Sequence, residues 1–290
     1  MFSNVVVGVD GRQGGRDAIA LAQQLATADA RLTLAHVYVE LLGRGATMAP
    51  AMQRRDATEL LESERARASV DAELATCGEL AVGRGLHELA EERHADLLVV
   101  GSTRHALLGR VLMGDDCRAA LDGAPCAMAI APRGYALAQH RLHRLGVGYD
   151  ATPASEDALS VARELATAHG SVLRAMWVVS IQQVQEDKPI PADWPQAIAE
   201  LLESHADRLA QLDSVDGIAS YGGPREDLTH FSKSLDLLIV GSRGFGPAGR
   251  LFHGSVSRHL ARHAACPLLV LPHPDAGAVR FASAGRAVAA

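Results

Sequence analysis

Short apolar runs alternate with longer segments of helical periodicity along the whole chain. In the first half, the β-branched runs predict strands, and apolar residues spaced three and four apart predict helices. The predicted strands are Asn4–Val9, Leu32–Val39, Glu79–Val82, Leu97–Val100 and Ala127–Ala131, and the predicted helices are Gly14–Asp29, Gln53–Thr76, Leu86–His94 and Gly114–Asp122. The second half repeats the pattern, with predicted strands Arg144–Tyr149, Val172–Val179, Gly217–Ser220, Leu237–Val240 and Leu268–Leu271.

Several of these runs are apolar on both faces, as in Leu97–Val100. Such strands suit a parallel sheet that is covered by helices on both sides. The alternation of strand and helix therefore predicts an α/β fold with two tandem, doubly wound, five-stranded parallel sheets of the Rossmann-like kind. Ligands of such sheets bind beyond the carboxyl ends of the strands. We expect Asp10, Gly101, Asp150 and Gly241 to lie at that edge.

The two halves of the sequence are copies of one unit. The motif Val7–Asp10 recurs as Val147–Asp150, and Asp96–Ser102 recurs as Asp236–Ser242, both at an offset of 140 residues. A period of this length suits a whole domain rather than a solenoid repeat. We therefore predict one domain over residues 1–138, a second over 142–274, and a loose Ala- and Gly-rich tail over 275–290.

Composition narrows the classes of partner. A formal net charge of −6 argues against nucleic acid, because neutralising phosphates needs a basic surface. No apolar run approaches the roughly 18 residues of a membrane span. The chain begins without a basic leader, and its 4 cysteines show no CxxC spacing. We expect a cytoplasmic protein with neither nucleic acid nor membrane as a partner.

A glycine-rich segment follows Val240 and contains Gly241, Gly244 and Gly254, the last followed by Ser255. Glycines let the backbone approach an anion closely, and the start of a helix at Ser255 would present free N–H groups to a phosphate. On the residues alone, a plain glycine-rich loop with Ser255 as a helix cap is an equally good interpretation.

The spacing of these residues resembles the nucleotide-binding signature of the universal stress protein family: glycine, two residues, glycine, nine residues, then glycine with Ser or Thr. The resemblance covers both halves, including the aspartates after the first strands and Cys266–Val270 in the last strand. It implies an adenine-nucleotide hydrolase-like fold that binds ATP, or AMP or ADP, with Mg²⁺. Asp150 would face the nucleoside and Val178 the adenine. The implied contact residues are Gly148, Asp150, Val178, Val240, Gly241, Arg243, Gly244, Gly254, Ser255, Val256 and Ser257.

The first half departs from the signature. Arg104 replaces the second glycine, and Asp115 replaces the Ser or Thr. An aspartate about 4 Å from a phosphate would cost about 4 kcal/mol at an effective dielectric near 20. A helix N-terminus returns only about 0.3–1 kcal/mol. We expect one strong site per chain. A weak first-half site would use Asp10, Val37, Gly101, Arg104 and Gly114.

Other motifs are weaker. Gly244–Gly249 matches the dinucleotide fingerprint G-x-G-x-x-G, but it follows a late strand and lacks an acid downstream. Neither a P-loop nor a nucleophile elbow is present. His259 and His263 stand four apart on a predicted helix, although solvated or capping histidines are favoured over metal ligands there. We predict no catalytic residue and no protein-bound metal.

The leading hypothesis is a stress-response sensor or switch that binds ATP in its second half and is not an enzyme. A nucleotide-independent interaction module and a slow ATP hydrolase are the alternatives. The resemblance also implies packing of the two halves as an intrachain pseudo-dimer, together with a homodimer. The segments Gly43–Pro50 and Gln182–Pro195 either cover the two sites or are plain surface connections.

Overall fold

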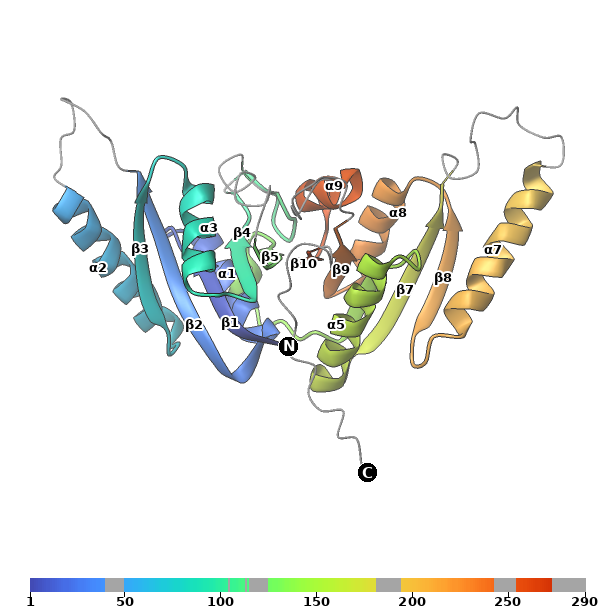
Figure 1. The fold of residues 1–290 in the computed structure, drawn as a ribbon, viewed down its shortest axis with the longest axis horizontal. Helices are drawn as coiled ribbons and strands as arrows, with labels where there is room; N and C mark the ends of the chain where they lie inside the picture. The colour runs from blue at the N-terminus through green and yellow to red at the C-terminus, as the bar shows by residue number, and fades with distance from the viewer. Residues whose placement is uncertain are drawn as a thin grey trace.

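The computed structural model describes residues 1–39, 50–103, 105–112, 114, 125–180, 194–242 and 254–272. The first half contains β1 (Phe2–Gly8), α1 (Gln13–Leu25), β2 (Ala26–Val39), α2 (Pro50–Ala68), β3 (Glu73–Glu79), α3 (Val82–Glu92), β4 (Leu97–Gly101), β5 (Ala127–Ala131) and the 3-10 turn η1 (Tyr135–Leu137) (Figure 1). The second half contains β6 (Arg144–Gly148), α5 (Pro153–His169), β7 (Val172–Val179), α7 (Trp194–Ala210), β8 (Asp216–Tyr221), α8 (Pro224–Phe231), the 3-10 turn η2 (Ser232–Ser234), β9 (Leu237–Gly241), α9 (Ser255–His263) and β10 (Leu268–Leu271).

Each half forms the predicted five-stranded parallel sheet, and the fold class is confirmed. The strand order across the described residues is β3-β2-β1-β4-β5-β10-β9-β6-β7-β8. The two sheets join edge to edge, because β5 pairs antiparallel with β10, for example Ala129 with Leu269. This pairing converts two exposed sheet edges into the middle of one ten-stranded sheet.

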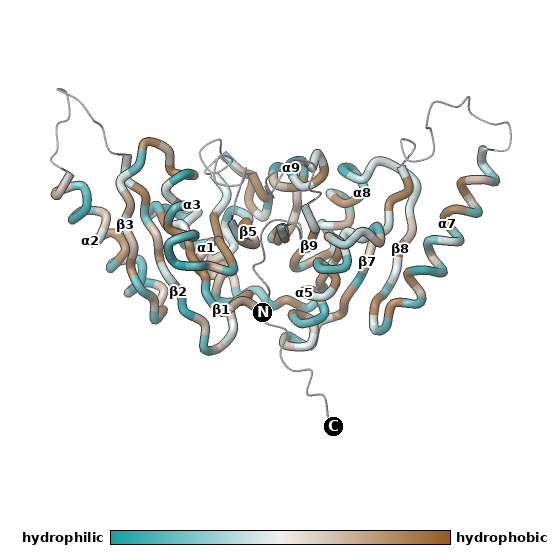
Figure 2. Tube along the Cα trace, in the orientation of Figure 1, coloured by the Kyte–Doolittle hydropathy of each residue, from teal (hydrophilic) through white to brown (hydrophobic). Residues whose placement is uncertain are grey.

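The strands bury both faces because helices cover both. Along β1, Val5 and Val7 belong to one buried cluster and Val6 to the other. Helices α1, α2, α5 and α7 supply side chains to the first cluster, and α3, α8 and α9 to the second. Hydrophobic positions accordingly follow the strands, while the helices carry hydrophilic positions between their hydrophobic ones (Figure 2).

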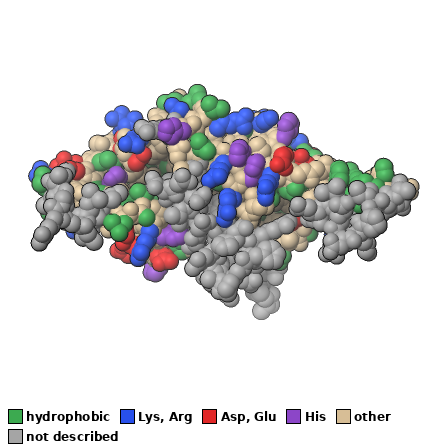
Figure 3. Space-filling view, turned by 90° about the horizontal axis from the view of Figure 1, so that it is seen from above, with side chains coloured by type: hydrophobic (Ala, Val, Ile, Leu, Met, Phe, Trp, Pro, Cys, Tyr) green, Lys and Arg blue, Asp and Glu red, His purple; other side chains and the backbone are tan. Residues whose placement is uncertain are grey.

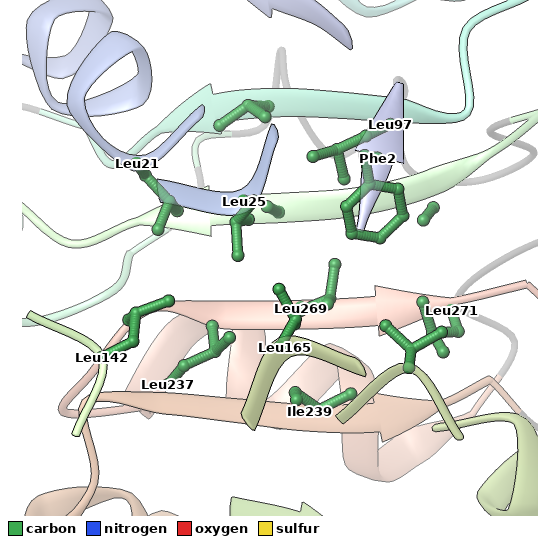
Figure 4. Close-up of a cluster of buried hydrophobic side chains, with 14 of the residues drawn as sticks. Phe2, Leu21, Leu25, Leu97, Leu142, Leu165, Leu237, Ile239, Leu269 and Leu271 are labelled. Atoms are coloured by element: carbon green, nitrogen blue, oxygen red, sulfur yellow. The ribbon is translucent and has the colours of Figure 1, made fainter. Parts of the chain in front are cut away.

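The first of these clusters runs through both halves. Phe2, Leu21 and Leu97 of the first half face Leu237 and Leu269 of the second across the β5–β10 junction (Figure 4). All of these side chains are essentially inaccessible to solvent. Burying large aliphatic and aromatic side chains contributes about 1.5–3 kcal/mol each. The two halves therefore share a core.

Several predicted boundaries are wrong. Helix α1 ends at Leu25 rather than Asp29, because β2 begins at Ala26, which pairs with Phe2 before an irregularity in the register. Helix α2 ends at Ala68 rather than Thr76, because Ser69 adopts a left-handed backbone (φ 49°). The third strand is consequently Glu73–Glu79 rather than Glu79–Val82, and Val82 begins α3.

Some predicted features lie outside the described residues. They are the helix Gly114–Asp122 beyond Gly114, the tail 275–290, the segment Gly43–Pro50 up to Pro50 and the segment Gln182–Pro195 up to Trp194. Pro50 and Trp194 begin α2 and α7. Among the helices that the structure describes, none combines the length and apolar character needed to cross a membrane.

Candidate functional site

A cavity of about 700 Å³ opens at the carboxyl edge of the second half. The ends of β6, β7 and β9 form its floor, and the first turns of α5, α8 and α9 form its walls. This is the edge of the sheet that faces the viewer in Figure 3. Its lining residues are Gly148, Tyr149, Asp150, Thr152, Ala154, Ser155, Met176, Val178, Ser180, Tyr221, Gly222, Gly223, Pro224, Arg225, Glu226, Leu228, Val240, Gly241, Gly254, Ser255, Val256 and Ser257.

The structure brings together on this cavity every described member of the predicted second-half set. These are Gly148, Asp150, Val178, Val240, Gly241, Gly254, Ser255, Val256 and Ser257. Arg243 and Gly244 lie outside the described residues, as does the fingerprint Gly244–Gly249. That these residues contact a ligand stays a prediction.

Gly241 is where strand β9 meets helix α5. A Cβ atom built on Gly241 would overlap the carbonyl oxygen of Ala154. The close approach requires glycine, and it places the end of β9 directly beside the first turn of α5. The cavity wall at this point is therefore backbone, which a ligand can approach closely.

Three helices begin at the cavity, and two of them, α5 and α9, differ in how their first turns are satisfied. In α5, Thr152 caps the helix and its hydroxyl oxygen accepts from the backbone N–H of Ser155 at 3.4 Å. In α9, the cap residue is Gly254, which has no side chain to accept such a bond. The first N–H groups of a helix need acceptors and carry its positive dipole end. Of these two helix starts, the α9 start is therefore the better anion site.

Asp150 lines the cavity and is held in a defined orientation. Its Oδ1 accepts from the Thr152 hydroxyl at 2.6 Å and from the Thr152 backbone N–H at 3.3 Å. Its own backbone N–H donates to the hydroxyl of Ser155 at 3.3 Å. The wall beyond it, towards β7 and α8, is apolar and includes Met176, Val178 and Leu228. The cavity thus combines an apolar wall, an oriented carboxylate and a helix N-terminus.

An aromatic stack lies on the opposite face of β7 from Met176 and Val178. Tyr149 donates a short hydrogen bond to Glu156 and meets Trp177 edge-on at 5.6 Å. Trp177 in turn stacks on His205 at 4.1 Å. Burial, reinforced by Glu156, raises the pKa of Tyr149 to about 12. Burial and Arg208 lower the pKa of His205. Both rings are therefore uncharged near neutral pH.

The sequence prediction missed the contribution of the third strand of the repeat. The segment Tyr221–Glu226 links β8 to α8 and lines the cavity. The signal was present, because Gly222-Gly223-Pro224 is a turn followed by a favoured first helical residue. Ligands of such sheets bind beyond the carboxyl ends of the strands, and this rule applies to β8 as well as to β6 and β9.

The predicted weak site in the first half has a different geometry. Asp10 accepts from the backbone N–H of Arg12 at 3.0 Å, and Gly101 packs tightly on Gly14 as Gly241 packs on Ala154. Helix α3, however, presses on Val37: a Cβ atom built on Gly85 would lie 2.7 Å from a Val37 methyl carbon. The space over Val37 is thus filled by the protein itself.

The first-half loop after β4 is closed by its own hydrogen bonds. The Ser102 hydroxyl donates to the carbonyl of Ala131 at 2.8 Å and accepts from the backbone N–H of Leu112 at 3.2 Å. The backbone N–H of Thr103 donates to the carbonyl of Leu112 at 2.9 Å. In contrast, the buried hydroxyl of Ser242, its counterpart in the second half, makes no hydrogen bond with any residue that the structure describes. Gly114 follows the closed loop, and Arg104 lies outside the described residues.

The histidine pair on α9 makes contacts within its own helix. The rings of His259 and His263 stack at 4.2 Å, and Nδ1 of His263 lies 2.9 Å from the carbonyl oxygen of His259. In the portion of the chain that the structure describes, no group of three or more His, Cys, Asp and Glu side chains is arranged to hold a metal ion.

A ten-stranded sheet built from two 3-2-1-4-5 halves, with a cavity at the carboxyl edge of the second half, defines a duplicated, doubly wound α/β protein. The model of the universal stress protein family matches residues 1–132 and again residues 141–272. The chain belongs to the universal stress protein family.

The chain is also similar to individual proteins. A universal stress protein of Mycobacterium tuberculosis is 29% identical over 201 residues, which is 66% of this chain and 69% of that protein. The crystal structure of a universal stress protein from Archaeoglobus fulgidus matches with a TM-score of 0.66 at 15% identity, over 92% of this chain and 97% of that one. A crystal structure of a universal stress protein in complex with cAMP covers 34% of this chain and 72% of that one, at 33% identity and a TM-score of 0.27.

Proposed function

We propose that the second half binds an adenine nucleotide in the cavity at the ends of β6, β7 and β9. ATP is the proposed ligand, with AMP and ADP as variants of the same chemistry. The observation that carries this proposal is the pairing of the uncapped start of α9, at Gly254 and Ser255, with the apolar wall formed by Met176 and Val178. A nucleotide has the matching polarity, since it joins an apolar ring to an anionic tail.

The cavity suits such a ligand in its volume and in the order of its polar and apolar lining residues. Its volume of about 700 Å³ lies within the range of small-molecule sites, roughly 300–1,000 Å³. The phosphates would lie at Gly241 and Ser255, the ribose near Asp150 and the base against Val178. An aspartate beside the ribose offers an acceptor for sugar hydroxyls, as in other nucleotide-binding α/β folds.

Mg²⁺ would accompany the phosphates. Protein-bound Mg²⁺ in nucleotide sites commonly uses one or two carboxylates together with phosphate oxygens and water. Asp150 and Glu226 are the acidic side chains on the cavity wall. The described residues hold no cluster that could bind the ion without the phosphates.

We propose that binding acts as a sensor or switch in a stress response and does not drive turnover. Membership of the universal stress protein family supports the stress-response role. Phosphate release from ATP tests the distinction, because ordinary enzymes turn over at rates of about 1 s⁻¹ or faster. A steady rate of that size would make the protein an ATP hydrolase instead.

Calorimetry with ATP on the wild type and on Ser255→Asp tests the site. An aspartate at the start of α9 favours the helix dipole, so the variant is expected to fold. It would stand about 4 Å from a phosphate, and a cost of about 4 kcal/mol corresponds to an affinity loss of about 1,000-fold. Ser214→Asp is the matched control, because Ser214 is exposed, lies outside the cavity and has a left-handed backbone (φ 59°) that aspartate tolerates. Equal binding by all three proteins would refute the assigned site.

A further inference from the structure

A short segment of the first half reaches across to the helix that carries the second-half site. The segment Ala106–Leu112, called the brace below, follows β4. The backbone N–H of Val111 donates to the carbonyl oxygen of Ala264 at 2.9 Å. The guanidinium of Arg110 donates to the carbonyl oxygen of His263 at 3.4 Å. Both acceptors lie at the C-terminal end of α9.

These contacts satisfy groups that α9 cannot satisfy by itself. The last carbonyls of a helix have no partner within the helix, and they need donors from elsewhere. The side chain of Val111 is also fully buried, in the same apolar cluster as Leu260 and Ala264. Hydrogen bonds and apolar packing from the first half thus converge on one end of α9. From its own half, the Ser232 hydroxyl accepts the backbone N–H of Ala265 at 2.9 Å.

The brace is itself tied firmly to the first half. The backbone N–H of Gly109 donates to the carbonyl of Arg133 at 2.9 Å, and that of Arg133 donates to the carbonyl of Arg110 at 3.1 Å. The Arg133 guanidinium donates to the carbonyl of Ala106 at 2.8 Å. Arg133 follows β5, the strand that pairs with β10. The brace therefore fixes α9 relative to the joined sheet.

The two ends of α9 have different partners. The helix spans nine residues, Ser255–His263, which is about 13 Å at 1.5 Å per residue. Its first turn lines the cavity, and its last turn meets the brace. A helix this short has little stability of its own, so its position depends on what holds it.

We propose that the brace is a positioning element for the second-half site: it holds α9 so that the first turn meets the anionic end of the ligand. This inference rests on the proposed nucleotide binding. It also gives the first half a role. The loop after β4 is closed by its own hydrogen bonds and supports α9, whereas its counterpart in the second half would bind phosphate. Because coupling between two sites is reciprocal, a ligand at Ser255 strengthens the contact at Val111.

The test is ATP affinity and amide hydrogen exchange on the full chain with Arg110→Ala and Val111→Ala combined. The first substitution removes the hydrogen bond to His263, and the second removes part of a buried side chain. Both changes lie at the far end of α9 from the cavity, and together they are expected to weaken ATP binding about three- to tenfold. The amides of residues 258–264 should exchange faster in the variant. In the wild type, ATP should slow exchange of the Val111 amide.

Two variants serve as controls. Leu107→Ala changes an exposed side chain of the brace (75% exposed) and should alter neither affinity nor exchange. Leu61→Ala opens a cavity under α2 in the first half, away from α9, and matches the loss of stability without touching the brace. An equal loss of affinity in Leu61→Ala would show a general stability effect and overturn the inference.

The remaining outcomes are distinguishable. Unchanged ATP affinity in the double variant overturns the positioning role, whether or not the amides of α9 exchange faster. Wild-type protein that binds no ATP refutes the proposed function, and the inference falls with it. In that case faster exchange over residues 258–264 would still show that the brace holds the helix.

Discussion

Gly241, at the end of β9, lies against the carbonyl oxygen of Ala154, in the first turn of α5, with no room for a side chain between them. Gly101 and Gly14 make the same contact in the first half. The duplicated chain thus contains a matched pair of glycines, of which one lines the cavity and the other does not. Substituting each glycine in turn therefore distinguishes the effect of this packing on stability from its effect on the candidate site.

Gly241→Ala should therefore abolish ATP binding, whereas Gly101→Ala should leave it nearly intact. Each added methyl group forces a strand end and a helix start apart, and such overpacking costs about 1–3 kcal/mol of stability. In Gly241→Ala the displaced backbone is also the wall where phosphate would lie. Chemical denaturation and calorimetry measure the two effects. Similar affinity in both variants would contradict the assignment of Gly241.

Asp150→Ala is predicted to weaken ATP binding by about tenfold, since it removes an oriented acceptor for the ribose hydroxyls. Asp10→Ala is the internal control, because Asp10 makes the corresponding turn, accepting from the N–H of Arg12, in the half with the closed loop. It should leave affinity unchanged. Titration calorimetry on the two variants would decide, and a larger effect from Asp10→Ala would move the site to the first half.

Tyr149 predicts a pH dependence of stability at alkaline pH. Its pKa is raised by burial and by Glu156 to about 12, above the value of about 10 in an unfolded chain. The neutral phenol therefore contributes stability that is fully present below about pH 10 and is lost as the pH rises towards about 12. The difference in unfolding free energy between wild type and Tyr149→Phe should shrink over that interval. A difference that stays constant with pH would contradict the raised pKa.

The α/β fold follows from the sequence because its signals are local. Runs such as Leu97–Val100 are apolar on both faces, and a repeat at a fixed offset predicts the same sheet twice. The edge strand β3 was harder to predict, since Glu73–Glu79 is half exposed and its pairing with β2 is made by the backbone. The junction of β5 with β10 joins strands far apart in the sequence, and no local pattern encodes which edges meet.

The sequence predicts those residues of the candidate site that belong to a motif or follow the end of a strand. Asp150, Gly241 and Ser255 follow from these rules. Two features could not be predicted from the sequence: the difference in capping between the starts of α9 and α5, and the closed loop of the first half. Both depend on which hydrogen bonds form in the folded chain. The brace is of the same kind, since nothing near Val111 in the sequence indicates its contact with Ala264. The homodimer remains a prediction.

The most direct measurement is a crystal structure of the full chain soaked with ATP and Mg²⁺. The account predicts adenosine phosphate in the second half alone, with the base against Val178 and the phosphates at Gly241 and the first turn of α9. Density in the first half only, or in neither half, would contradict it.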